Sequence, residues 1–177
     1  MALTNAYVLP TNRIADLFQR IRDGQAPDRF TNQILKDWGF SSTNDRAFIP
    51  LLKALGFLTA DGKPTPRYLE YRDHSQSKRI LGQAIREAYR DIFLIKENPT
   101  ASDRHAIERK FKTIHNASDN VAGLMTKTFF GLLPLADLAA APPVRLPKID
   151  SLGHLKETNG FEERPAERDH RVLNRSF

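Results

Sequence analysis

The chain has no cysteine among its 177 residues, so it can form neither a disulfide framework nor a thiolate metal site. This absence fits a reducing compartment, and we expect a cytoplasmic protein. The first residues lack the basic start and long apolar run of a secretory signal peptide. Asp137 and three prolines interrupt the most apolar stretch, residues 129–144. We therefore expect no membrane-spanning helix.

Motifs for phosphate binding and catalysis are also missing. Neither the GxxxxGK[ST] nor the GxGxxG pattern occurs, so the sequence lacks a glycine-rich phosphate loop of either kind. There is no GxSxG nucleophile elbow. The five histidines form no HxxxH or HExxH pair that would suit a metal. We predict that the protein is not an enzyme and uses no metal or other cofactor.

The charge balance is basic, with 27 Lys and Arg against 21 Asp and Glu and a formal net charge of +6. Such a balance favours polyanionic partners or simply improves solubility. A chain of this length can form one domain or two small ones and can bury a substantial core.

The most regular pattern lies in residues 30–72. Apolar residues recur at helical spacing over residues 30–38 and again over residues 45–55. A polar turn, residues 41–44, separates the two series. A further amphipathic helix is expected over residues 12–23. Together these patterns predict a three-helix core that contains a helix-turn-helix.

Two features follow from proline and glycine. Pro50 requires the third helix to begin late, near Asp45 or Arg46, so that the proline falls in or just after its first turn. Asp61 and Gly62 are typical central residues of a hairpin turn. We therefore expect a short two-stranded β-hairpin after the third helix. Its second strand should be irregular because prolines follow the turn.

The predicted fold class is mainly α, a winged helix-turn-helix unit with a short β-hairpin and a C-terminal helical extension. The winged-helix unit would span residues 1–73. The extension, residues 74–138, would pack on it and contain three more helices, the first running to about Ile95. The last part, residues 139–177, is polar and aperiodic, and we expect it to be disordered or ordered by a partner.

Several stretches resemble a prokaryotic family that is known only as a domain of unknown function, family 5343. They occur in the expected order over about residues 7–138 and read YVLPTNRIADLF, APDRFTNQILKDWGF, SSTNDRAFIPLLKALGFLTADGKPTPRYLEYRD, IREAYRDIF and SDNVAGLMTKTFFGLLPLAD. The resemblance implies no catalytic residues, because none is established for the family. The expectations for the fold and for DNA binding come from the residues themselves.

The helix-turn-helix pattern predicts binding of double-stranded DNA, in a regulatory role or within a prokaryotic defence or mobile-element system. Arg46 and Lys53 are seven residues apart and would share one helix face that could reach a groove or phosphates. Lys63 at the hairpin and Arg67 beyond it could contact the DNA backbone. The predicted nucleic-acid-binding residues are Asn44, Arg46, Lys53, Lys63 and Arg67.

Each of these side chains also has an ordinary interpretation as a solvated surface charge. Winged helices serve as protein-contact modules as well. The alternative function is therefore a non-enzymatic protein-interaction adaptor. The apolar residues 129–138 could then bury against a second copy, giving a homodimer, or against another protein.

Overall fold

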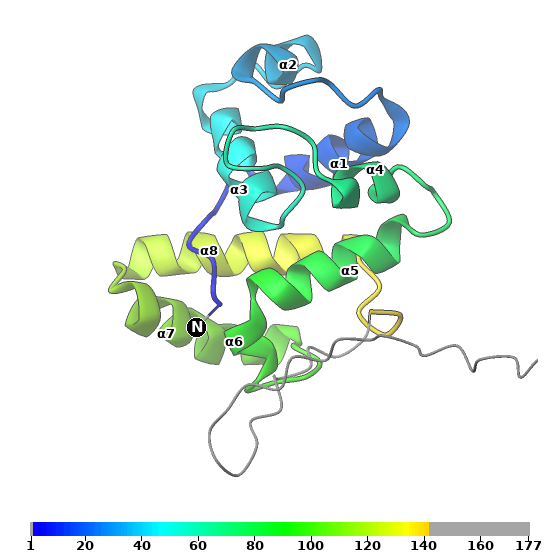
Figure 1. Cartoon of the computed structure of the whole chain (residues 1–177). Coiled ribbons are helices and arrows are strands. Elements are labelled where there is room, and N and C mark those ends of the chain that lie inside the picture. The colour runs from blue at the N-terminus through cyan, green and yellow to red at the C-terminus, as the bar shows by residue number, and fades with distance from the viewer. Residues whose placement is uncertain (1, 142–177) are drawn as a thin grey trace, which may run out of the picture. The chain divides into compact units, whose positions relative to one another are not determined.

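The computed structural model describes residues 2–141, and helices dominate this part of the chain (Figure 1). The α-helices are α1 (Ile14–Asp23), α2 (Asn32–Asp37), α3 (Phe48–Ala54), α4 (Pro66–Tyr71), α5 (Ser77–Ala88), α6 (Arg90–Phe93), α7 (Arg104–His115) and α8 (Asp119–Leu132). Four short 3-10 helices accompany them, namely η1 (Thr11–Arg13), η2 (Thr43–Ala47), η3 (Ala101–Asp103) and η4 (Leu133–Leu135). The mainly α prediction is confirmed.

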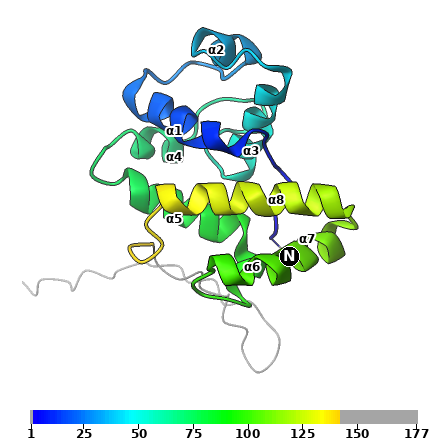
Figure 2. The same cartoon turned by 180° about the vertical axis from the view of Figure 1, so that it is seen from behind.

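The first four α-helices lie on one side of α5 and α8, and α6 and α7 lie on the other side, as the two opposite views show (Figures 1 and 2). α7 and α8 form an antiparallel pair whose turn contains Asn116 in a left-handed conformation with φ 48°. One hydrophobic cluster runs through both groups of helices, from Leu3 to Leu132. Residues on both sides of position 73 therefore share a core.

The N-terminal segment ties the two groups of helices together. The Thr4 amide donates to the carbonyl of Ala88, and the Asp91 amide donates to the carbonyl of Ala2. The amide of Val8 donates to the Thr128 hydroxyl of α8, with a nitrogen–oxygen distance of 3.0 Å. These bonds hold residues 2–8, which precede η1 and α1, against α5, α6 and α8.

The predicted two-stranded hairpin is wrong. Residues 57–65, which we call the wing loop, contain only an isolated antiparallel bridge between Leu58 and Pro64, and no strand occurs in residues 2–141. Pro64 has no amide hydrogen, so a ladder cannot continue through it. The turn also differs from the expected one. The Gly62 amide donates to the Thr59 carbonyl, and within residues 59–62 only Gly62 has a positive φ, 83°. Asp61 therefore precedes the left-handed residue rather than adopting that conformation itself.

The segment expected to hold the second strand instead leads into α4. Thr65 caps this helix by accepting from the Tyr68 amide, and Pro66 occupies its first turn, where the missing N–H costs no hydrogen bond. Tyr71 of α4 then packs edge-on against Phe18 and Phe57, with ring centroids 5.5 and 5.4 Å away. This aromatic cluster joins α1, the wing loop and α4.

Helices also begin and end differently from the predicted ranges. α3 begins at Phe48, after the separate 3-10 turn η2, so Pro50 is in its first turn. This agrees with the expected late start. The long helix expected to reach Ile95 is broken at Tyr89, where α5 ends and α6 begins. The buried Tyr89 ring packs at this break against Phe129 and Phe111.

After η4 the chain folds back across α5. The Asp137 amide donates to the Lys78 carbonyl, and the Arg86 guanidinium donates to the Leu138 carbonyl from Nε and Nη2 at 3.3 and 3.1 Å. Gly82 makes this approach possible, because a Cβ there would lie 2.4 Å from the Asp137 carbonyl oxygen. The described residues all belong to one compact unit. Beyond Ala141, the predicted disordered tail lies outside the described residues.

Candidate nucleic-acid interface

In the segment predicted to be a helix-turn-helix, α2 is followed by a turn, by η2 and then by α3. The Thr31 side chain caps α2 by accepting from the Ile34 amide. Gly39, with φ 90°, lets the chain leave α2 in a left-handed turn. Ser42 and Asp45 then form a capping box at the start of η2. The Ser42 hydroxyl accepts from the backbone amide of Asp45, and the Asp45 carboxylate accepts from the backbone amide of Ser42. Local sequence signals therefore define both helix starts.

Asp45 fixes this turn to the rest of the molecule. Its carboxylate is fully buried, and Oδ2 accepts from the Ser42 amide at 3.0 Å and from Arg13 Nη1 at 2.6 Å. The second terminal nitrogen of Arg13 donates to the Gly39 carbonyl at 2.7 Å. The same guanidinium lies over the Phe40 ring, 4.4 Å from its centroid. One arginine from η1 thus contacts three residues of the turn, Gly39, Phe40 and Asp45.

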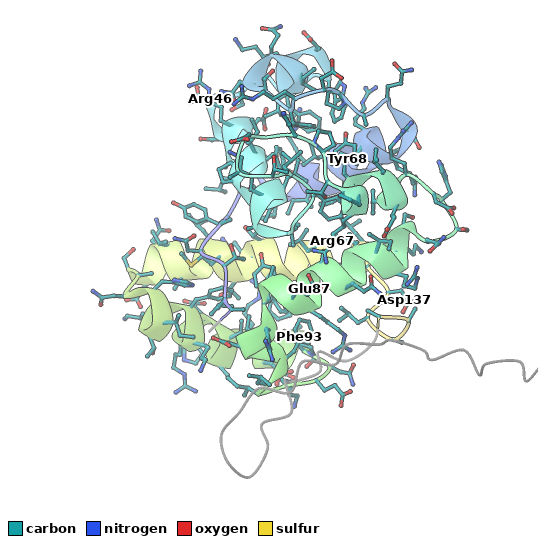
Figure 3. The ribbon with its side chains drawn as sticks, viewed as in Figure 1. Arg46, Arg67, Tyr68, Glu87, Phe93 and Asp137 are labelled. Carbon is teal, nitrogen blue, oxygen red and sulfur yellow. The ribbon has the colours of Figure 1, made fainter. Side chains whose placement is uncertain are left out.

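Asn44 and Arg46, on either side of Asp45, are exposed. Arg46 points outward from η2, away from α5 and α8 (Figure 3). The only acidic residue among these three positions is buried and paired with Arg13. The exposed surface at this point therefore offers an amide and a guanidinium, while the carboxylate between them in the chain is buried.

Two further predicted residues are also free to contact a ligand. Lys53 lies in the last turn of α3 and is exposed. Lys63 is exposed in the wing loop, where only its backbone is used, since its amide donates to the Thr59 hydroxyl and its carbonyl accepts from the Thr59 amide. No ion pair involves Lys53 or Lys63 within the described residues.

Arg67 differs from the other predicted residues because its side chain is used internally. Nη1 donates to the Leu55 carbonyl at the end of α3, at 2.8 Å, and Nη2 lies 2.5 Å from Glu87 Oε2 on α5. Figure 3 shows Arg67 reaching toward Glu87. In this arrangement Arg67 joins α3, α4 and α5, and its guanidinium is engaged by partners within the fold.

Arg29 is a candidate that sequence reasoning missed. Its Nε donates to the Asp61 carbonyl at 2.7 Å, and the Phe30 amide beside it donates to the Gly62 carbonyl, also at 2.7 Å. These bonds bring the exposed Arg29 to the tip of the wing loop, near the turn that carries Lys63. Arg29 and Asp61 are 32 residues apart, and no local pattern links them.

The proposed protein-contact segment, residues 129–138, packs largely within the fold. Phe129 and Leu132 are fully buried, whereas Phe130, Leu133 and Leu135 are half-buried. The most exposed large apolar side chains among the described residues include Leu94 and Ile95, which are 57% and 64% exposed just after α6.

Other kinds of site find little support in residues 2–141. No group of three or more His, Asp and Glu side chains is gathered there in a way that could hold a metal ion. None of the helices in this range combines the length and apolar character needed to cross a membrane.

Comparison with known proteins gives a family but no activity. No curated protein and no solved structure matches the chain. The model of a family of unknown function, DUF5343, matches residues 6–143, a range that contains every helix from α1 to α8. The chain belongs to the DUF5343 family of unknown function.

Proposed function

We propose that the protein binds double-stranded DNA through a winged-helix-like unit whose wing is the short wing loop. The observation that carries this proposal is the arrangement at Asn44, Asp45 and Arg46. The two side chains suited to base edges are exposed, and the acid that would repel DNA is buried against Arg13. Such an arrangement gives a turn an outward surface with polar and positive groups only.

Each exposed residue has a chemical counterpart on DNA. An arginine can bond in bidentate fashion to the O6 and N7 atoms of guanine, and an asparagine can bond to N6 and N7 of adenine. Arg46 and Asn44 are therefore the proposed base-reading residues. Lys53, Lys63 and Arg29 are proposed phosphate contacts, which position the protein without reading sequence. A DNA-binding unit of this kind suits a regulatory role or a prokaryotic defence or mobile-element system.

The first test compares single variants by fluorescence anisotropy with a labelled DNA duplex. Arg46→Ala should weaken binding, since it removes a positive side chain from the proposed interface. Arg109→Ala removes the same charge from an exposed position on α7 and should leave binding unchanged. Equal effects of the two substitutions would show that only net charge matters and would overturn the proposed interface.

The alternative is a protein-interaction adaptor, and exposed Leu94 and Ile95 favour it. Large apolar side chains exposed side by side are typical of surfaces that bind protein. The partner could be a second copy, with residues 129–138 contributing their half-buried side chains. If the protein is an adaptor, the Leu94→Asp variant should no longer dimerise or bind its partner, as measured by light scattering or pull-down. Its weak DNA binding should stay unchanged.

A further inference from the structure

A groove of about 620 Å³ lies beside the helix-turn-helix, between α1 and the end of α2 (both labelled in Figure 2). This volume falls in the range of sites that bind small molecules. Its polar and aromatic lining includes Arg13, Asp16, Gln19, Arg20, Asp23 and Trp38. The DNA-binding proposal uses none of the last five.

The lining combines both signs of charge with two aromatic rings, those of Trp38 and Phe40. Asp16, Arg20 and Asp23 are exposed and follow each other at spacings of four and three along α1, so they lie on one helix face. Among the described residues neither Asp16 nor Arg20 forms an ion pair. Trp38 is half-buried and held edge-on against Phe30, with ring centroids 5.3 Å apart. A ring fixed in this way can stack on a planar ligand group without losing further freedom.

These charges constrain what the groove can hold. A purely anionic ligand at Arg20 would have Asp16 and Asp23 on either side of it. A purely cationic ligand at the carboxylates would meet Arg20. A dipolar ligand satisfies both signs at once. The geometry points to a site for an aromatic α-amino acid in its zwitterionic form, with its carboxylate on Arg20, its ammonium group on Asp16 and its ring against Trp38.

The groove also borders the proposed DNA-reading turn. Arg13 lines the groove and at the same time holds Asp45, which lies between Asn44 and Arg46. A ligand held by Arg20, Asp16 and Trp38 would share the groove with Arg13 and so would alter how Arg13 supports these two residues. The groove is therefore an effector site for DNA binding. This regulatory step rests on the proposed function, whereas ligand binding in the groove does not.

The ligand site can be tested without DNA because Trp38 is the only tryptophan in the chain. Its fluorescence should change saturably when L-phenylalanine is titrated into the full-length protein. L-phenylalanine methyl ester, which lacks the anion, and N-acetyl-L-phenylalanine, which lacks the cation, should each bind at least about tenfold more weakly, a factor that corresponds to about 1.4 kcal/mol. The Arg20→Gln and Asp16→Asn variants should lose affinity to a similar degree.

Matched controls are available elsewhere on the surface. Arg109→Gln on α7 and Asp28→Asn before α2 change the same charges at exposed positions outside the groove and should leave the titration unchanged. The site is overturned if L-phenylalanine causes no saturable change up to about 10 mM, tenfold above a millimolar dissociation constant. It is also overturned if either singly charged derivative binds as well as the zwitterion.

The regulatory step is measured separately, by DNA anisotropy with and without saturating L-phenylalanine. Coupling between two sites commonly changes affinity by about fivefold or more. We expect a change of at least this size in the parent protein and none in Arg13→Gln. Ligand binding with unchanged DNA affinity overturns the effector role. A protein that binds L-phenylalanine but no DNA overturns the proposed function and the effector role while leaving the ligand site in place.

Discussion

Arg13 Nη1 lies 2.6 Å from Asp45 Oδ2, and this pair joins the 3-10 turn before α1 to the 3-10 turn before α3. Asp45 is fully buried, whereas the Arg13 side chain is 30% exposed. A buried carboxylate that loses its cation is left uncompensated, which is the costly outcome for such pairs. The arrangement therefore makes the position of the proposed DNA-reading turn depend on one arginine.

The first prediction concerns this pair. Arg13→Gln should lower the free energy of unfolding by about 1–3 kcal/mol, because Asp45 loses a charge-assisted hydrogen bond. Asp45→Asn removes the negative charge, and in that background Arg13→Gln should cost less. A double-mutant cycle followed by urea denaturation measures the coupling. Additive effects would mean that the pair does not hold the turn.

The second prediction uses two helical glycines with different surroundings. Gly82→Ala places a Cβ 2.4 Å from the Asp137 carbonyl oxygen, so the returning segment must move off α5, at a cost of about 1–3 kcal/mol. Gly123→Ala meets nothing closer than Glu108 Oε1 at 3.9 Å and should stabilise α8 by about 0.5–1 kcal/mol. Thermal unfolding of both variants tests the packing. Equal effects would contradict the close approach of residues 136–141 to α5.

The third prediction separates Arg67 from the proposed DNA-binding residues. Arg67→Met keeps the aliphatic stem but removes the bonds to Leu55 and Glu87, so stability should fall by about 1–3 kcal/mol. Glu87→Gln, which leaves the Leu55 bond intact, should cost less, about 0–1 kcal/mol. Neither variant should change the salt dependence of DNA binding. Weaker DNA binding at unchanged stability would return Arg67 to the interface.

The fourth prediction is a loss of stability at high pH. Burial raises the pKa of Tyr68 and of Tyr71 from the ordinary value of 10 to about 12. Below pH 10 both tyrosines are neutral in the folded and unfolded chains, so they add no pH dependence. Between about pH 10 and 12 the unfolded chain releases protons that the folded chain keeps, so the free energy of unfolding falls as the pH rises.

Urea denaturation across this range measures the fall, and Tyr68→Phe should make it shallower because one of the tyrosines whose pKa is raised by burial is gone. The ultraviolet absorbance of tyrosinate in the folded protein gives an independent readout. If all four tyrosines of the chain ionised near pH 10 without unfolding, the burial of Tyr68 and Tyr71 would be contradicted.

Much of the helical fold could be predicted from apolar spacing, because burial on one helix face leaves a periodic trace. Ile14, Leu17, Phe18 and Ile21 are all buried in α1, as their spacing indicates. The hairpin could not be predicted in the same way, since a turn signal does not show whether neighbouring prolines permit a ladder. α4 had a local signal that was missed, namely Thr65 and Pro66 at the cap and first turn of a helix.

The candidate site was less predictable because it depends on long-range pairs. The exposure of Arg46 and Lys53 follows from the helical pattern around them. The burial of Asp45 and the internal use of Arg67 depend on Arg13 and Glu87, which are 32 and 20 residues away. Charged residues look alike in a sequence whether they face solvent or a partner inside the fold. Only the packed structure separates the two.

The most direct test of DNA binding is a salt series of anisotropy titrations for the parent protein and for Lys53→Ala, Lys63→Ala and Arg46→Ala. Neutralised phosphates release counterions, so the logarithm of affinity should fall linearly with the logarithm of salt, by about 0.9 per contact. Each lysine substitution should remove one phosphate contact and so make the slope shallower by about 0.9, whatever the sequence of the DNA duplex. Arg46→Ala should also cost about 1–3 kcal/mol at one base position. If the parent protein binds DNA and none of the three substitutions changes the slope or the affinity, DNA recognition by this surface is contradicted.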